Sequence, residues 1–334
     1  GVLLAGRYGF FSARRPFMIG DVTVNPFGLS PTPILITIGA FVLVGFIHWE
    51  RRLVSTGRSP LLRPRILRNA PFMASAATDT VRQLALAGIL FVVPVFTLST
   101  LGFSAMESGL AILPFSAAVF VLSMTTSGLA SRVAPKWLVL GGLAVFAVGL
   151  FVLQLVLSAE MEIVDFIVPM LIMGVGVGLF VAQIVNLTIS QVSDDERSEG
   201  AGAHNTFREL GSSLGTAVIG AVMVAAVFTN LTDAALRAEN LEASPRERDA
   251  LAVQLEDAAG KVSPEDGEAW VASLPADEQA GLVESVASAQ VDAMATALSW
   301  TIGFVILGLL VGTFLPGRSK REEKMEPGIR AELK

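Results

Sequence analysis

Two groups of charged residues stand at the edge of long apolar runs. One is Arg208 and Glu209, within GAHNTFRELGSSLGTAVIG at 202–220, and the other is Asp79 and Arg82. After each group an uncharged run follows that is long enough to cross nearly a whole bilayer. Ionisable residues near the hydrocarbon usually face the interior of a helix bundle or a water-filled path, where they carry protons or bind ions. Both groups are therefore candidates for proton coupling or substrate binding.

The two groups are expected to lie at similar depth, on helices that run in the same direction. This predicts crosswise pairs, Asp79 with Arg208 and Arg82 with Glu209. A carboxylate held between burial and a neighbouring guanidinium can exchange a proton for a cationic ligand, which makes Glu209 the leading coupling or substrate carboxylate. The alternative is that both groups form structural ion pairs at the cytoplasmic interface of the membrane.

Other site chemistry is sparse. The chain has no cysteine and only two histidines, His48 and His204. No metal site and no cofactor are expected from such a set. His204, beside Asn205, is a side chain that titrates near neutral pH, with a capping or interfacial role as the alternative. No nucleophile, base and metal ligand converge, and no phosphate-binding loop is present, so neither an enzyme nor an ATP-driven pump is predicted.

The composition is that of a membrane protein. Of 334 residues, 52% are hydrophobic and 16% are charged, and the mean hydropathy is +0.63. Apolar runs of about 20 residues cross a bilayer as helices, because each backbone must satisfy its own hydrogen bonds there. We predict an all-α membrane protein with about seven transmembrane helices of an incomplete chain, at 31–49, 73–101, 108–130, 137–158, 164–189, 200–228 and 291–315. Residues 1–11 read as the end of an eighth.

Basic residues set the expected orientation. The loop 50–71, the loop after the third span and the tail 317–334 are rich in Arg or Lys and lie on one side if the spans alternate. By the positive-inside rule that side is cytoplasmic, which predicts a multi-pass protein of the plasma membrane with a cytoplasmic C-terminus. The acidic loop 190–200 falls on the same side and gives this orientation no support.

One segment is too polar to cross. Residues 229–289 hold 13 acids and 4 bases, a net charge of −9, and read as amphipathic helices broken at proline and glycine. We expect an extracellular helical insert. The predicted organisation is a helix end, one span and a basic cytoplasmic linker at 1–71, a bundle at 72–228, the insert at 229–289, a last span at 290–316 and a cytoplasmic tail at 317–334.

Four stretches resemble one family. They are ERR with SPLLRPRILRN in the linker, LGFSAMESGLAILP at 101–114, GLASRVAPKWLVLGG at 128–142 and GAGAHNTFRELGSSLGTAVIG at 200–220. In order and spacing they resemble the C-terminal half of a fourteen-helix drug:proton antiporter of the major facilitator superfamily, the QacA/EmrB type.

The resemblance implies a major-facilitator-type helical bundle and proton-coupled efflux of small amphipathic or drug-like compounds. Its partners would be a small-molecule substrate, protons, the lipid bilayer and the missing N-terminal half of the same chain, with no nucleic acid. It places Glu209 at an acidic position that such pumps use for cationic drugs or protons, and His204 and Asn205 where they have further acids. A non-transporting membrane receptor or assembly subunit is the alternative function.

Overall fold

A computed structural model describes residues 17–19, 22–24, 31–56, 63, 65–129, 133–238, 241, 243–260, 262 and 264–317. The proposed helix end at 1–11 and the tail from 318 lie outside these ranges. Within them the chain is almost wholly helical. The long helices are α2 (Pro31–Ser55), α3 (Ala70–Ser99), α4 (Ala105–Leu129), α5 (Pro135–Val156), α6 (Ile167–Ile189), α7 (Arg197–Ala238) and α10 (Ala276–Gly312).

The predicted fold class is confirmed. Seven helices of the described chain are long and apolar enough to cross a membrane. The sequence did not predict the small antiparallel hairpin of β1 (Phe17–Ile19) and β2 (Val22–Val24), in which Met18 is paired with Thr23. Short 3-10 turns precede three of the long helices: η2 (Ile66–Arg68), η3 (Ile163–Phe166) and η4 (Asp194–Glu196).

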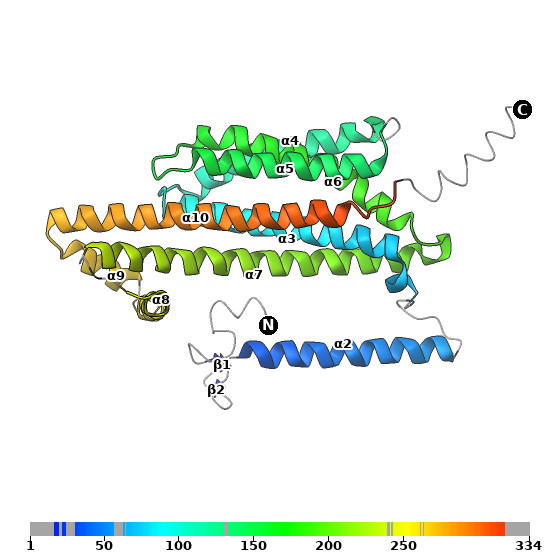
Figure 1. Ribbon diagram of the computed structural model, residues 1–334, viewed down its shortest axis with the longest axis horizontal. Coiled ribbons are helices and arrows are strands. Elements are labelled where there is room, and N and C mark those ends of the chain that lie inside the picture. Colours follow the sequence, from blue (N-terminus) through cyan, green and yellow to red (C-terminus); the bar gives the residue numbers. More distant parts are fainter. Residues whose placement is uncertain are drawn as a thin grey trace, which may run out of the picture.

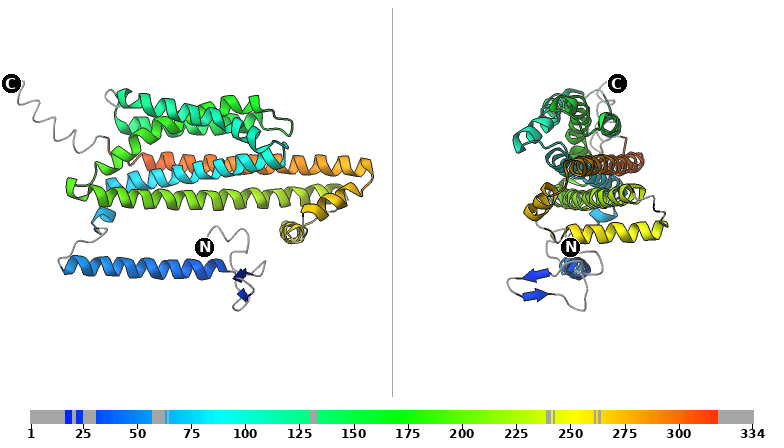
Figure 2. Two further views of the ribbon diagram at one scale, coloured as in Figure 1. Left: turned by 180° about the vertical axis from the view of Figure 1, so that it is seen from behind. Right: turned by 90° about the vertical axis from the view of Figure 1, so that its left-hand side faces the viewer.

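Six of the long helices form one bundle with two layers. Helices α4, α5 and α6 lie together in one layer, and α3, α7 and α10 lie in the other (Figures 1 and 2). Helix α6 packs against both α4 and α5, while α10 contacts α3, α5 and α7. The core between the layers is built from large buried side chains, among them Phe96, Phe146 and Phe180. The close van der Waals packing of these side chains holds the layers together.

Helix α2 stands apart from this bundle (Figure 1). Only 6% of its apolar stretch, which lies within Pro33–Leu53, is buried inside the structure. Side chains on all its sides are exposed, including Phe41, Val42 and Leu43. In a membrane these side chains would contact lipid or another protein segment, since a helix that is apolar all round is not stable in water.

Two of the helices extend beyond the predicted spans. Helix α7 continues ten residues past the predicted end at 228, and α10 begins fifteen residues before 291. Between them lie α8 (Pro245–Ala259) and α9 (Pro264–Ala272), which begin at prolines because that residue fits the first helical turn. Arg248 on α8 forms a bidentate ion pair with Asp233 on α7, and this pair fastens the insert to the bundle.

Glycines set the closest helix contacts. A Cβ atom added to Gly215 on α7 would lie 2.0 Å from the carbonyl oxygen of Leu84 on α3, and one added to Gly211 would lie 2.3 Å from that of Thr80. Small residues allow helix backbones to approach in this way inside a membrane. The seam between α3 and α7 is therefore fixed by the two glycines, and it carries the charged residues described next.

Candidate functional site

Three ionisable side chains are buried together at the seam between α3 and α7. Asp79, Arg82 and His204 are 1%, 4% and 2% exposed. The Nε of Arg82 donates to Oδ1 of Asp79 at 2.8 Å, and the Nε2 of His204 lies 3.0 Å from Oδ2 of the same carboxylate. One carboxylate thus lies between a guanidinium and an imidazole. We call these three residues the buried triad.

The arginine has two further contacts. Its Nη2 donates to Oε1 of Gln83 at 2.7 Å, and its Cζ lies 5.0 Å from the centre of the Phe180 ring on α6. A cation over an aromatic face is stabilised by the charge distribution of the ring. Sequence reasoning missed Phe180, because a phenylalanine inside an apolar helix gives no signal that separates a cation partner from core.

The imidazole is unusually placed. Its Nε2 lies 3.0 Å from Oδ2 of Asp79, and its Nδ1 has no hydrogen-bond partner in the described chain. Buried polar groups are nearly always hydrogen-bonded, so an exception such as this marks a functional or strained group.

The predicted crosswise pairs are wrong. Asp79 contacts Arg82 and His204, whereas Arg208 and Glu209 lie near each other, 3.4 Å apart, with 42% and 69% of their side chains exposed. The reason is the helical period. His204 is seven residues from Gly211 and eleven from Gly215, so all three share the face of α7 that packs on α3.

The other side of α7 presents polar groups. Asn205, Glu209 and Ser213 are exposed and follow one another at intervals of four residues, which places them in one line along the helix. We call this line the polar stripe. Farther along the same side, Ala221 and Val224 are exposed and apolar. The six predicted site residues thus fall into two separate places: three in the buried triad, and Asn205, Arg208 and Glu209 at the exposed side.

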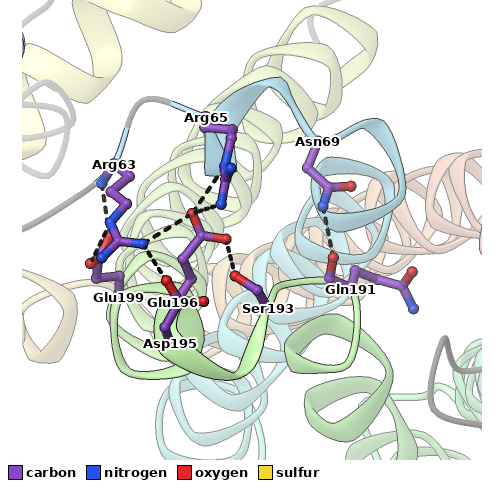
Figure 3. A network of polar contacts seen from close by, with 8 residues as sticks. All are labelled: Arg63, Arg65, Asn69, Gln191, Ser193, Asp195, Glu196 and Glu199. Atoms are coloured by element: carbon purple, nitrogen blue, oxygen red, sulfur yellow. Dashed lines mark hydrogen bonds and ion pairs between the residues drawn. The ribbon is translucent and has the colours of Figure 1, made fainter.

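A third polar cluster joins the linker to the loop between α6 and α7 (Figure 3). Arg63 donates to Asp195 at 2.7 Å, and its backbone N–H donates to Glu199 at 2.9 Å. Arg65 donates through Nε and Nη2 to Glu196, at 3.1 and 2.7 Å. The hydrogen bond that Arg63 donates to Asp195 and the nearby charge of Glu199 raise the pKa of Arg63. We call these five residues the linker cluster.

The linker cluster explains the acidic loop. Three acids of 190–200, namely Asp195, Glu196 and Glu199, pair with arginines of the linker, so both segments lie at the same end of the bundle. At that end Lys136, in the first turn of α5, also donates to the carbonyl of Thr313 just after α10. Three basic segments were predicted to share one side of the membrane. Two of them, the linker and the start of α5, make contacts at this end of the bundle.

Together, the apolar helices, the glycine-lined seam and the charges inside the bundle define a multi-pass membrane protein of the helical-bundle class. Residues 16–216 match the sequence profile of the Major Facilitator Superfamily. The chain belongs to this superfamily, and the resemblance drawn from the sequence motifs is confirmed.

Several relatives have been named for what they export or resist. The chain is 25% identical over 313 residues to the probable actinorhodin transporter of Streptomyces coelicolor, covering 87% of this chain and 54% of that one. It is 28% identical over 180 residues to the multidrug resistance protein Stp of Mycobacterium tuberculosis, covering 54% and 32%. The puromycin resistance protein pur8 of Streptomyces alboniger is 24% identical over 202 residues, with 60% and 39% covered. The chain spans about half or less of the length of these relatives.

Proposed function

We propose that this chain forms the C-terminal half of a secondary transporter that exports small amphipathic or drug-like compounds in exchange for protons. Membership of the superfamily and the names of the relatives support an efflux function. In transporters of this superfamily the substrate site lies near the middle of the membrane between two helical repeats. The missing wall of that site would be an N-terminal half of the same chain.

The observation that carries the proposal is the polar stripe on α7. Glu209 and Asn205 lie on a helix that also contains a long apolar membrane segment, on the side opposite α3. Charged and amide side chains are costly against lipid, and they usually face a water-filled cavity. The stripe would therefore line the path between the two halves, with Glu209 as its carboxylate for a proton or a cationic substrate.

The orientation follows from the same arrangement. The end that carries the linker cluster would be cytoplasmic by the positive-inside rule, and the insert with α8 and α9 would be extracellular. Glu209 lies twelve residues after the start of α7 at Arg197, about 18 Å along the helix axis. In this orientation Glu209 would lie on the cytoplasmic half of the path.

The test is efflux from cells that lack their own drug pumps and express the full native protein. Ethidium serves as a cationic probe and Nile red as a neutral one. Glu209→Gln keeps the size of the side chain and removes its charge, and Glu284→Gln, at an exposed carboxylate of α10 in the insert, is the matched control. We expect Glu209→Gln to lose efflux at an unchanged level in the membrane, and Glu284→Gln to retain it.

Two outcomes contradict the proposal at different levels. Wild-type efflux by Glu209→Gln would show that this carboxylate is an interfacial structural residue. Equal probe accumulation in cells with and without the protein, for both probes, would argue against transport and favour a membrane receptor or assembly subunit.

A further inference from the structure

We infer that the buried triad is a proton-operated switch, in which a proton on His204 draws Asp79 away from Arg82. The site is separate from the polar stripe, because His204 faces α3 whereas Glu209 is exposed on the other side of α7. The use of this proton to drive export rests on the proposed function. The switch itself is a property of the described helices.

The geometry gives Asp79 one partner on each carboxylate oxygen. Its Oδ1 accepts from Arg82, and its Oδ2 faces His204 at 3.0 Å. The Nδ1 of the imidazole has no hydrogen-bond partner in the described chain. A neutral imidazole carries a lone pair on one of its two nitrogens. A proton from water can add to that lone pair, and the imidazolium then has N–H groups on both nitrogens, one of which donates to Oδ2. No covalent bond other than this N–H is formed or broken.

Charge balance makes the two states different. With His204 neutral, Asp79 and Arg82 cancel, and the buried site carries no net charge. With His204 protonated, one buried carboxylate faces two cations, and the site holds one excess positive charge, which is costly away from water. Of the helices packed around it, α3 has no other charged residue, and neither α6 nor the stretch Ala293–Gly312 of α10 has any. On α7 itself, Glu199 is bound to Arg63 and Glu209 is exposed.

The structure already provides the place to which Arg82 would move. Its guanidinium contacts Gln83 and lies over the ring of Phe180 on α6. Both contacts are compatible with a cation that has given up its carboxylate. Protonation would thus strengthen the link between α7 and α3 through His204, and shift Arg82 toward α6. A proton on His204, at the seam between α3 and α7, would in this way change the packing of α3 against α6 in the other layer.

The experiment follows the protonation state of the His204 ring by NMR. The sequence has two histidines, so His48→Gln leaves His204 as the one imidazole signal from residues 1–334. Ring-labelled ¹⁵N NMR of the full protein in nanodiscs, from about pH 5 to 9, covers the range in which histidine changes charge. We expect the ring signals of His204 to change with pH, and this change to be displaced or lost in Asp79→Asn. Glu209→Gln, on the exposed side, should leave it unchanged.

A second signal keeps the test decisive if Asp79→Asn fails to fold. In the His48→Gln background, the Nε resonance of Arg82, assigned by its loss in Arg82→Lys, should move over the same pH range as the His204 transition. A His204 ring that stays in one protonation state, an Arg82 signal that does not follow it, or an unchanged transition in Asp79→Asn would each overturn the switch. None of these measurements needs substrate or transport, so they stand even where the proposed function fails.

Discussion

The seam between α3 and α7 can be tested by adding a single methyl group. Gly215 faces the backbone of α3, and a Cβ atom there would lie 2.0 Å from the oxygen of Leu84 and 2.8 Å from its carbonyl carbon. Ordinary contacts of a Cβ atom begin at 3.4 Å. Gly215→Ala must therefore move the two helices apart by about 1.4 Å at this point, because the clashing atoms belong to backbone and cannot rotate away.

The expected cost follows from overpacking. A methyl group forced into a closely packed site destabilises a protein by about 1–3 kcal/mol. Alanine also favours a helix over glycine by up to about 1 kcal/mol, which partly hides the clash. Gly202→Ala on the same helix corrects for this, since a Cβ atom there meets nothing within 4 Å. We expect Gly215→Ala to be less stable than Gly202→Ala by about 1–3 kcal/mol.

The assay is reversible unfolding in mixed micelles by titration with SDS, followed by far-ultraviolet circular dichroism. The same helix separation should lengthen the contact between His204 and Asp79, so the NMR transition of His204 should also change in Gly215→Ala and not in Gly202→Ala. Equal unfolding curves for the two variants would refute the close approach of α3 and α7, and with it the geometry of the buried triad.

Three further predictions concern the two ends of the molecule. Arg63→Gln should speed amide hydrogen exchange in η2, and about 0.5 M NaCl should do the same to the wild type, because exposed ion pairs are screened by salt; equal exchange in all samples would show that the linker cluster does not hold η2. The hydroxyl and the backbone N–H of Ser244 lower the pKa of Glu247 from its ordinary 4.5, so the cap of α8 should be intact above that value and be lost as the pH falls through the lowered pKa. Hydrogen exchange corrected for intrinsic rates measures this in α8, and Ser244→Ala should abolish the pH dependence; a pH dependence that survives in Ser244→Ala would contradict the cap. A single cysteine placed at Glu160 should react with an impermeant maleimide added outside intact cells, and one at Asp195 only after lysis; residues 1–334 contain no other cysteine. The reverse pattern would invert the orientation.

Hydropathy was sufficient to predict the helices. Runs of apolar residues cross a membrane only as helices, so the seven spans could be located without knowledge of their packing. It did not predict the ends of α7 and α10, because both continue as polar helix beyond the apolar run. Hydropathy also could not show that α2 stands apart from the bundle, since its composition resembles that of the other spans.

The pairing predicted for the charged residues was wrong. Asp79 does lie level with the start of the apolar run of α7, where it contacts His204. Which residue of α7 meets it depends on the rotation of that helix, and the rotation is set by Gly211 and Gly215 against α3. The pattern of charges in the sequence does not show which glycines bring two helix backbones into contact. The acidic loop similarly had no explanation until the arginines of the linker were placed beside it.

The central claim, proton-driven export, is tested most directly in everted membrane vesicles that contain the full native protein. With no ATP present, a pH gradient is imposed with the vesicle interior acidic, and uptake of ethidium and Nile red is followed by fluorescence. The account predicts uptake that collapses when nigericin dissipates the gradient and is absent in Glu209→Gln. Proton-driven export would be contradicted by uptake that does not depend on the pH gradient, or by no uptake of either probe into wild-type vesicles.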